Sequence, residues 1–347
     1  MPRAVKNSMH PEVSIHLIVR NGQNYLRECL EHVEAQTYPN IKLRIFDNAS
    51  DDGTPETAAR IAPSAEIIRF DKNYIVGGGF NRSLAYSESP YVVLLCVDVL
   101  IDPHFVERAV EAMQVDKKRG VLQAKVLWYD GHEKRKTDTI DTTGMQIFRS
   151  RRITNRGHGE RDEGQYDGAG EVFCYEGAVP FFRRVALEDV AMQREGEERQ
   201  EYLDEDFMWY ADEVDLGWRM RLLGWSSWYD PSVVAWHDRS TTHRLSAGWK
   251  DFIAQRKGIP ANKRMLDLRN QRLAFLKNDF FVTMAMHSPW ILKRELFLFA
   301  YISLFEQSSL VAYWQLLRMG PKALRKRRVI MERRVAGEHE MRAWFLS

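Results

Sequence analysis

Polar side chains follow three apolar segments in the first hundred residues, each at the point where the segment ends. They are Arg20 and Asn21 after 13–19, Asp47 and Asn48 after 41–46, and Asp98 after 91–97. In open α/β sheets, ligands bind outside the carboxyl ends of the strands, so these side chains converge if the segments are parallel strands. A carboxylate such as Asp98 that ends a strongly apolar strand is costly unless it is paired or metal-bound. The spacing therefore predicts a ligand site that includes a cation.

Some of these residues also have a structural interpretation. Asp47 and Asp51 lie in the segment DNASDDGT, and Asx side chains commonly cap turns of this kind. Asp102, which precedes Pro103, is in a position to cap a helix. Turn capping and ligand binding stay open for Asp47, whereas the pattern favours a ligand-binding role for Asp98.

A glycine triplet, Gly77–Gly79, lies within the segment NYIVGGGFN that runs from Asn73 to Asn81. Three consecutive glycines at the start of a helix allow a ligand to approach the backbone closely. The spacing is not G-x-G-x-x-G, and the triplet does not follow the first strand, so the dinucleotide-binding fingerprint is absent. A tight structural turn is the alternative.

The densest acidic run is LDEDFMWYADEVD, residues 203–215, in which aromatic side chains are interleaved with carboxylates. A solvated acidic face is the ordinary interpretation of such a run. A carboxylate set among aromatics ahead of a helix is also a candidate general base. Downstream, His237 follows the apolar run VVAW. A single histidine is usually structural, but one near a proposed cation is a candidate ligand through its neutral imidazole.

The elements that must position these groups alternate in type. Strands are expected at 13–19, 41–46, 65–69 and 91–97, and helices at about 25–33, from 55, at 104–113 and at 214–223. Alternation of this kind predicts βαβ units and a mostly parallel sheet flanked by helices. Residues 130–170 lack clear periodicity, so long loops or a small β-layer are expected there.

The C-terminal region, residues 251–347, is expected to be helical and to follow a catalytic domain of residues 1–250. Leu296–Leu317 carries one formal charge, Glu306, and a basic stretch follows it between Arg318 and Arg334. The length suffices for a transmembrane helix, but the polar residues favour an amphipathic interfacial helix. The basic stretch suits anionic lipid, at ~1 kcal/mol per cationic residue. A helical bundle packed on the catalytic domain, or a dimer interface, is an equal alternative.

Composition narrows the classes further. The chain has 347 residues, of which 44% are hydrophobic, enough for one large domain with an appendage. A formal net charge of +2 gives no nucleic-acid signature. Cys29, Cys96 and Cys174 form no disulfide framework or zinc motif, which points to a reducing compartment. The first fourteen residues lack an apolar core, so no secretory signal is expected. A cytoplasmic protein is predicted, peripheral on the inner face of the membrane if the C-terminal region contacts lipid.

Taken together, these motifs resemble the family-2 glycosyltransferases of the GT-A fold, especially their rhamnosyltransferase-like branch. The matching segments, in order, are VSIHLIVRNGQNYLRECLEHVEAQTYPN, IFDNASDDGT, NYIVGGGFNRSLAYSESPYVVLLCVDVLIDP, YEGAVPFFRR, LDEDFMWYADEVDLGWRMRLLGW and VVAWH. They fall within residues 13–245, approximately. The resemblance implies a GT-A domain, which is a Rossmann-like, mostly parallel sheet flanked by helices, with a C-terminal helical extension.

The resemblance also implies a role for each motif. The nucleotide-sugar donor would be bound by Arg20, Asn21, Asp47, Asn48, Asp51, Asn73, Gly77, Gly78, Gly79 and Asn81. Asp47 would contact the nucleobase. Asp98 and His237 would ligate a divalent cation, Mg²⁺ or Mn²⁺, at the donor diphosphate. The acidic helix would supply the base that deprotonates the acceptor hydroxyl.

Two departures from the family pattern affect these roles. Cys96 stands at the earlier acidic position of the metal motif, so Asp98 is its single carboxylate. The family usually has Glu-Asp where this chain has Asp212-Glu213, which makes Glu213 the aligned base and Asp212 the second candidate. A glutamate is one methylene longer than an aspartate, so the backbone would have to compensate. Asp215 is expected to be structural.

The implied reaction is a single displacement with inversion, by a hexosyltransferase of cell-surface polysaccharide biosynthesis. The branch favours dTDP-rhamnose as the donor and a lipid-linked glycan as the acceptor. The expected partners also include an anionic membrane surface and a second copy of the chain, but no nucleic acid. A nucleotidyltransferase is a weaker alternative, because Asn21–Asn24 is not a basic phosphate loop. The exchanged Asp212-Glu213 leaves a second alternative, a catalytically degenerate sugar-nucleotide-binding or scaffold protein.

Overall fold

Strands buried along their whole length stand at the centre of the fold. β1 (Val13–Val19) and β4 (Tyr91–Leu95) are buried at every position, as expected for strands that are covered on both faces. The computed structural model describes residues 10–239 and 256–347. The domain boundary predicted near residue 250, and most of the N-terminal segment in which no secretory signal is expected, lie outside these residues.

The main sheet has a parallel half and a mixed half. In spatial order its strands are β10 (Gly170–Val172), β14 (Ser226–His237), β6 (Arg119–Asp130), β11 (Phe181–Arg183), β4, β1, β2 (Ile41–Asp47) and β3 (Glu66–Arg69). The last four run parallel to one another. The antiparallel strand β11 joins them to β6, which pairs with β14 in parallel. β5 (Val99–Ile101) pairs with β14, and β7 (Arg135–Thr142) pairs with β6.

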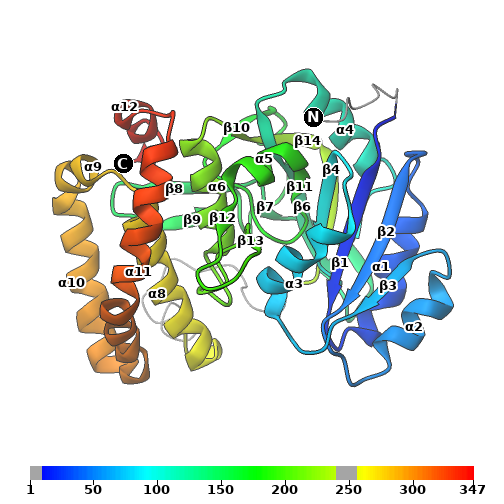
Figure 1. Ribbon diagram of the computed structural model, residues 1–347, viewed down its shortest axis with the longest axis horizontal. Helices are drawn as coiled ribbons and strands as arrows, with labels where there is room; N and C mark the ends of the chain where they lie inside the picture. The colour runs from blue at the N-terminus through cyan, green and yellow to red at the C-terminus, as the bar shows by residue number, and fades with distance from the viewer. Residues whose placement is uncertain (1–9, 240–255) are drawn as a thin grey trace.

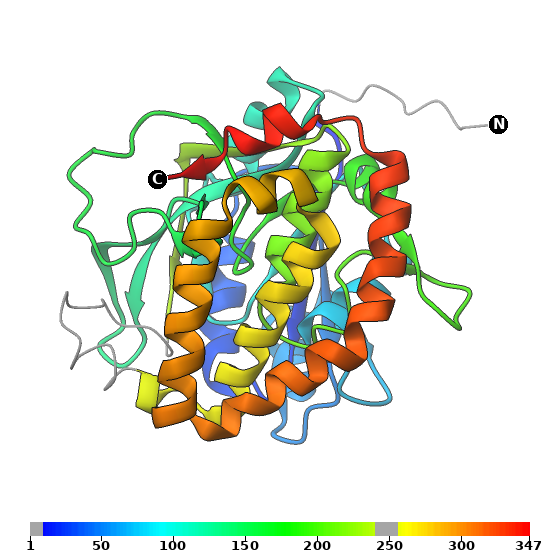
Figure 2. The ribbon, with the colours of Figure 1, turned by 90° about the vertical axis from the view of Figure 1, so that its left-hand side faces the viewer.

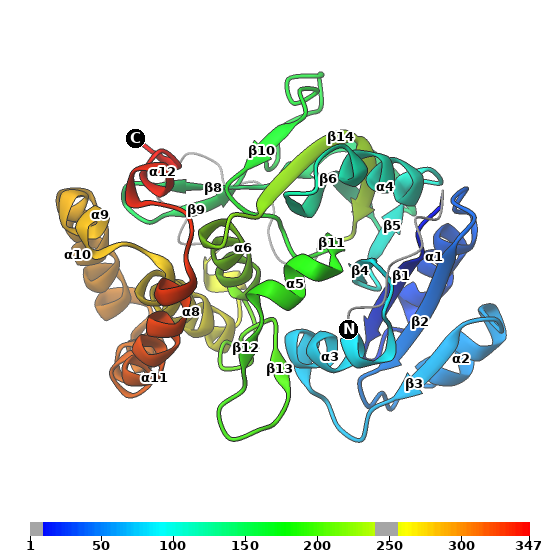
Figure 3. The same cartoon turned by 45° about the horizontal axis from the view of Figure 1, so that its top comes forward.

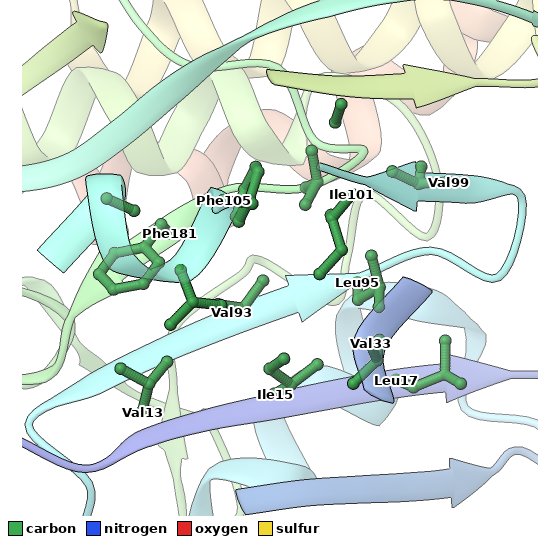
Figure 4. Close-up of a cluster of buried hydrophobic side chains, with 14 of the residues drawn as sticks. Val13, Ile15, Leu17, Val33, Val93, Leu95, Val99, Ile101, Phe105 and Phe181 are labelled. Carbon is green, nitrogen blue, oxygen red and sulfur yellow. The ribbon is translucent and has the colours of Figure 1, made fainter. Parts of the chain in front are cut away.

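Helices cover this sheet, as the alternating pattern predicts. They are α1 (Gln23–Glu34), α2 (Thr54–Ile61), α3 (Ile75–Ser83) with the short η1 (Leu84–Tyr86), α4 (Phe105–Val115), α5 (Arg184–Val190) and α6 (Asp212–Leu222). On one face, side chains of β1, β4 and β5 meet Val33 of α1 and Phe105 of α4 (Figure 4). This packing fixes the strand ends at which the polar clusters lie.

The region between β6 and α6 is a small β-layer joined by loops, one of the two predicted possibilities. β8 (Met145–Phe148) lies between β9 (Ile153–Asn155) and the C-terminal β15 (Phe345–Leu346). β12 (Met192–Gln193) and β13 (Gln200–Glu201) form a hairpin that projects from the molecule near α3 (Figure 3).

The C-terminal helices form a separate layer beside α6, on the side away from β1 (Figure 1). They are α8 (Ala261–Asn278), α9 (Phe281–Met286), α10 (Ser288–Phe305), α11 (Val311–Arg333) and α12 (Glu338–Arg342). Trp218 of α6 shares one apolar cluster with Leu273 and Phe275 of α8 and Ala323 of α11. The C-terminal layer therefore packs directly on the element that carries the acidic run.

The prediction of one continuous apolar helix at Leu296–Leu317 is wrong. α10 ends at Phe305, the short η2 (Gln307–Leu310) follows, and the chain reverses into α11 (Figure 2). Glu306 is buried at the break and accepts hydrogen bonds from the Arg256 guanidinium at 2.6 and 2.8 Å. Because a buried carboxylate needs such a partner, the chain turns there. Within the described ranges, no helix is both long and apolar enough to cross a membrane.

Candidate functional site

The polar ends of β1 and β2 meet at one edge of the sheet. The parallel register places Val19 beside Asp47. The backbone N–H of Asn21 donates to the Ser50 hydroxyl at 3.0 Å, which joins the turn after β1 to the turn after β2. Arg20 is exposed at the same edge. The structure thus brings the first two predicted clusters together.

The turn after β2 is held by its own acidic residues. Asp47 is fully buried; it accepts a hydrogen bond from the Ser50 N–H at 3.1 Å and pairs with Arg69 Nε at 3.3 Å. The N–H of Asp51 donates to Asn21 Oδ1 at 3.0 Å, while the Asp51 side chain is exposed. Asp47 therefore caps the turn in this structure, as its structural interpretation predicts, and both of its carboxylate oxygens have protein partners.

Asn48 and Asn73 fix the start of α3 against this turn. Asn48 Oδ1 accepts a hydrogen bond from the Tyr74 N–H at 2.8 Å, and its Nδ2 donates to the Ile75 carbonyl at 3.1 Å. Asn73 is exposed and caps the helix through its Oδ1, which accepts from the Ile75 N–H at 2.8 Å. These asparagines shape the edge of the site through backbone contacts.

The glycine triplet lets α3 approach its neighbours closely. A Cβ on Gly79 would lie 2.9 Å from the Ile18 side chain, and one on Gly77 would lie 3.3 Å from Asp212 Oδ2. On the third side, a Cβ on Gly78 would meet Tyr74 at 3.3 Å. The triplet is therefore buried between the sheet and the acidic helix, and any larger side chain would push these elements apart.

Asn81, at the end of the same segment, is committed to the acidic run. Its Oδ1 accepts hydrogen bonds from the N–H groups of Tyr202 and Leu203 at 3.1 and 2.9 Å. Its Nδ2 donates to the Leu203 carbonyl and to Glu205 Oε1 at 2.8 and 2.9 Å. Asn81 thus links α3 to residues 202–205.

Unusual backbone conformations are concentrated in the turns after β1 and β2, at the start of α3 and in the loop before α6. These segments hold six of the eight described non-glycine residues with positive φ: Asn21, Ala49, Ile75, Met208, Tyr210 and Ala211. The φ of 60° at Ile75 stands out, because a β-branched side chain disfavours this region. Such residues cost ~1–3 kcal/mol each and persist where the surrounding structure over-determines them.

Asp98 lies beside His237, as predicted. The antiparallel pairing of β5 with β14 sets His237 opposite Val99, so His237 Nε2 is 3.6 Å from Asp98 Oδ2. The other ring nitrogen, Nδ1, is hydrogen-bonded to Asp141 Oδ2 at 2.9 Å. Burial alone would lower the pKa of His237, but its hydrogen bonds to Asp141 and Asp98 raise it to about 10.

Asp141 and Glu176 extend this charged group. Asp141 is fully buried on β7 and pairs with Arg239 Nε at 2.7 Å. Burial alone would raise the pKa of Asp141, but hydrogen bonds from His158 and His237 hold it below its ordinary range. Arg239 Nη2 also pairs with Glu176 Oε1 at 2.6 Å. A single network therefore links Asp98 to Glu176 through His237, Asp141 and Arg239.

The Asp98–His237 pair has the chemistry of a partial cation site. Asp98 offers carboxylate oxygens with a side chain 35% exposed, and Asp141 orients His237 so that Nε2 faces Asp98. A carboxylate that orients a ligating histidine is a common arrangement at metal sites. In the part of the chain that the structure describes, no three His, Cys, Asp or Glu side chains form a complete metal cluster. A cation bound here would displace the proton that the raised pKa keeps on His237, and it would take further ligands from the donor diphosphate or water.

The acidic helix presents a coupled carboxyl pair. Asp212 and Glu213 begin α6, and each carboxyl group affects the ionisation of the other. Burial raises the pKa of Glu213 well above its ordinary value, and the negative charge of Asp212 raises it further. Burial also raises the pKa of Asp212. A carboxylate with a raised pKa is a stronger base, which suits a group that must remove a hydroxyl proton.

Cys96 lies between the two charged groups. Its N–H donates to the Ala178 carbonyl at 3.1 Å, and its thiol is buried beside the Gly177 carbonyl. Burial raises the pKa of the Cys96 thiol, and the negative charges of Asp98, Glu176 and Asp212 add to that effect. Asp98, Glu176 and Asp212 are therefore all near enough to this strand end for their charges to act on the Cys96 thiol.

The loop before α6 is held by α8 from the C-terminal layer. Asn270 Nδ2 donates to three carbonyls of this loop, those of Phe207, Trp209 and Tyr210, at 2.8, 2.6 and 2.9 Å. Arg269 Nη2 donates to the Phe207 carbonyl as well, at 3.2 Å. The buried side-chain amide of Asn270 thus holds the backbone of the loop that leads into Asp212 and Glu213.

Lysines of the C-terminal layer pair with Asp204, Asp206 and Asp215 of the acidic run, whereas Glu205 pairs with Arg82 and Arg199. Lys277 pairs with Asp204 at 2.5 Å and with Asp215 at 2.8 Å, and all three side chains are buried. Lys326 pairs with Asp204 at 2.6 Å, and Lys322 pairs with Asp206 at 2.7 Å. Asp215 is structural, as expected. Part of the basic stretch predicted to face anionic lipid instead binds the catalytic domain.

Residues 14–190, which are 177 of the 347 residues, match the glycosyl transferase family 2. The chain belongs to glycosyl transferase family 2. An uncharacterized glycosyltransferase from Nostoc sp. is 29% identical over 138 residues, 39% of this chain and 41% of that protein. The chain thus matches less than half the length of this curated relative. A second relative, an uncharacterized glycosyltransferase from Rickettsia bellii, is 27% identical over 147 residues, which are 20% of its length.

Two solved structures share the fold. The mannosyltransferase PcManGT from Pyrobaculum calidifontis, in complex with GDP-Man and Mn²⁺, has a TM-score of 0.51 at 17% identity, covering 97% of this chain and 85% of its own. GalNAc-T7 with UDP, GalNAc and Mn²⁺ has a TM-score of 0.54 at 9% identity. The match covers 86% of this chain and 59% of the GalNAc-T7 chain. The predicted GT-A fold with a C-terminal helical region is confirmed, and the predicted glycosyltransferase class is confirmed at the level of the family.

Several residues of this family-2 site were not predicted from the sequence. Asp141 and Arg239 hold His237, Glu176 joins the network, and Asn270 holds the loop before α6. A signal existed for two of them: Glu176 lies in YEGAVP, and Arg239 follows the histidine of VVAWHDR. Asp141 and Asn270 lie in segments without any motif, so only the fold brings them to the site.

Proposed function

We propose that the protein is an inverting glycosyltransferase that moves a sugar from a nucleoside-diphosphate donor to a hydroxyl of a glycan acceptor. The observation that supports this most directly is that the Asp98–His237 pair and the acidic pair, Asp212 and Glu213, both lie near the strand end at Cys96. An in-line displacement needs these two functions: stabilisation of a leaving diphosphate and a base for the nucleophile.

In the proposed reaction, the acceptor hydroxyl oxygen forms a bond to the anomeric carbon while the bond from that carbon to the diphosphate oxygen breaks. Glu213 accepts the hydroxyl proton, and the nucleoside diphosphate leaves with the electron pair of the broken bond. A divalent cation held by Asp98 and His237, Mg²⁺ or Mn²⁺, would neutralise the charge gathering on the diphosphate. Asp141 positions His237 for this role through the hydrogen bond to Nδ1.

The donor site is proposed at the joined turns after β1 and β2 and at the start of α3. Of the residues predicted for this site, Arg20, Asn21, Asp51 and Asn73 are exposed and are proposed to contact the donor. The others are buried and are proposed to shape the site from behind; they are Asp47, Asn48, Gly77, Gly78, Gly79 and Asn81. Hydrogen bonds hold the two turns and the start of α3 together at one edge of the sheet, and this supports a shared ligand site there. The donor dTDP-rhamnose and a role in cell-surface polysaccharide synthesis stay predictions from the rhamnosyltransferase-like branch.

A lipid-linked acceptor is proposed because the outer helix α10 has its polar side facing the protein. Glu295 of α10 pairs with Arg272 of α8 at 2.5 Å, and Arg294 donates to the Gln271 side chain at 3.2 Å. The opposite side of α10 exposes apolar residues, for example Leu296 at 68%. An ordinary surface helix has the reverse orientation, with its apolar side toward the core.

We define the outer apolar face as the exposed apolar side chains of α9, α10 and the first half of α11. They are Phe281, Val282, Met286, Trp290, Leu292, Leu296, Phe297, Phe299, Leu304, Phe305, Val311, Trp314 and Leu317. Both carboxylates between 281 and 317, Glu295 and Glu306, are paired with arginines. Lys293 and Arg318 are exposed beside the face. Apolar and aromatic side chains with cations and no exposed acid suit an anionic lipid surface.

Thermal-shift measurements with nucleoside diphosphates and nucleotide sugars, with and without Mn²⁺, test the donor assignment, because ligands of the native state raise its Tm. A metal-dependent shift with one nucleotide class, together with release of that nucleoside diphosphate, is expected. A shift without any turnover would favour the degenerate-scaffold alternative. No shift with any donor would overturn the proposed function.

Vesicle flotation with anionic and neutral lipid tests the outer apolar face. We expect the protein to float with anionic vesicles, and Leu296→Asp combined with Leu304→Asp to abolish flotation. Val115→Asp, at an equally exposed apolar residue on α4, serves as the matched control. If the double variant floats like the control, the face does not bind lipid. If it instead dissociates an oligomer in solution, the face is an interface between copies of the chain.

A further inference from the structure

An aromatic pair, the exposed Trp209 and the half-buried Tyr210, lies just before the acidic pair and is separated from it by Ala211. Trp209 is 46% exposed, and its ring stacks on Tyr210 with centroids 6.0 Å apart and 18° between the planes. The neighbouring Phe207 is buried and supplies the apolar packing of the same loop. Trp209 is therefore not needed for the core, although its large apolar surface would ordinarily be buried.

The backbone conformation of this loop fixes the direction in which the two aromatic rings point. Met208, Tyr210 and Ala211 have φ values of 64°, 67° and 61°, in the left-handed region that non-glycine residues rarely occupy. Asn270 fixes this conformation by donating to the backbone carbonyls of Trp209 and Tyr210. A strained loop fixed in this way indicates that the direction of its side chains matters.

The pair lies next to the charged groups of the cleft. Tyr210 is three residues before Glu213 in the chain. Burial raises the pKa of Tyr210, and its hydroxyl is near enough to Asp267, Arg239 and Glu213 for their charges to shift that pKa as well. On the outer side, the Lys263 ammonium lies 4.8 Å from the Trp209 ring centroid. Tyr210 therefore lies close to the proposed base, and Trp209 continues the aromatic surface outward.

We propose that Trp209 and Tyr210 form the acceptor subsite, in which they stack against one face of a pyranose ring whose hydroxyl reaches Glu213. This inference rests on the proposed function and adds the acceptor class, a glycan with a terminal pyranose. A pyranose presents a face of C–H groups, and an aromatic ring offers it an apolar surface with a negative π-face. The ring edge carries hydroxyls, which suits a site flanked by Lys263, Arg239 and carboxylates.

Trp209→Ala tests the subsite, with Trp209→Phe as the conservative variant and Tyr86→Ala as the control. Tyr86 is 45% exposed on η1, outside both carboxyl pairs. Binding is measured on an array of soluble oligosaccharides ending in different pyranoses, and acceptor KM is then measured with the best-bound sugar. Trp209→Ala should raise acceptor KM about 3- to 10-fold at unchanged donor KM. Trp209→Phe should recover most of the affinity, and Tyr86→Ala should match the wild type.

The proposed function and the subsite can fail separately. Donor hydrolysis without acceptor reports on the donor and cation sites and should be the same in Trp209→Ala and wild type. Unchanged array binding and acceptor KM in Trp209→Ala would overturn the subsite while leaving the transferase intact. Wild-type protein that turns over donor but binds no oligosaccharide on the array would also overturn it. Absence of donor hydrolysis and transfer in every protein would instead be a failure of the proposed function.

Discussion

The two sides of the cleft are built from contacts of different range. On the donor side, hydrogen bonds join residues about 30 apart, such as Asn21 to Ser50 and Asn48 to Ile75. On the acceptor side, Asn270 reaches back 60 to 63 residues to the loop before α6, and Lys326 reaches Asp204 across 122. The donor side is therefore a product of consecutive βα units, whereas the acceptor side is completed by the C-terminal layer.

The kind of contact differs as well. The turns of the donor side rely mainly on backbone hydrogen bonds, asparagine amides and close packing of glycines, together with the Asp47–Arg69 pair. The acceptor side relies on buried ion pairs, because its acidic run brings several carboxylates out of water together. Breaking one partner of a buried pair is far more costly than losing a neutral hydrogen bond. Changes on the acceptor side should therefore affect both catalysis and stability, and changes on the donor side mainly binding.

Glu213→Gln should have the largest effect. Without the base, transfer should fall by about 10²–10⁴-fold. Donor affinity, measured by calorimetry with the nucleoside diphosphate and Mn²⁺, should stay within twofold of wild type, because Glu213 lies on the acceptor side. Asp212→Asn serves as the matched variant, and near-normal turnover in Glu213→Gln together with loss in Asp212→Asn would assign the base to Asp212.

Lys277→Met should be the most destabilising change. It leaves Asp204 and Asp215 buried with one fewer cation, and loss of one partner of a buried pair costs about 3–5 kcal/mol. Chemical denaturation measures this loss. Arg328→Met, which breaks an exposed pair with Glu332 on α11, should leave the unfolding midpoint unchanged. Equal midpoints for the two variants would mean that the lysine network does not hold the acidic run.

The contrast also explains what the sequence could predict. Periodicity and motif order predict the parallel strands and the joined turns after β1 and β2, because those contacts are local. The pairing of Asp98 with His237 also follows, since both end strands of the same sheet. The sequence also predicts that the glycine triplet lies at the start of a helix, but it does not indicate that the triplet packs against Asp212.

The remaining contacts depend on packing that no local pattern encodes. Glu306 was interpreted as an isolated charge in an apolar helix, but Arg256 lies 50 residues before it and makes the position a helix end. The sequence of the basic stretch in α11 resembles a lipid-binding segment. In the structure, however, Lys322 and Lys326 form ion pairs with carboxylates of residues 201–206. In both cases the partner is decided by tertiary structure.

Two asparagine variants sharpen the comparison further. Asn270→Ala leaves three carbonyls of the loop before α6 without this donor, at a cost of about 1–3 kcal/mol. It should lower kcat at unchanged donor affinity. Asn48→Ala removes two hydrogen bonds at the start of α3 and should weaken donor binding by up to about tenfold at nearly unchanged kcat. The opposite assignment of these effects would contradict the division between the two sides.

The pH dependence of kcat is the subtlest test, because it separates the members of the acidic pair. Burial and the charge of Asp212 raise the pKa of Glu213. A base acts only when deprotonated, so kcat should rise with pH through a value above the ordinary glutamate range. Asp212→Asn removes the neighbouring charge, lowers the pKa of Glu213, and should move this limb to lower pH. Glu332→Gln, at an exposed carboxylate on α11, should leave it in place. A limb that does not move in Asp212→Asn would show that the two carboxyls titrate independently.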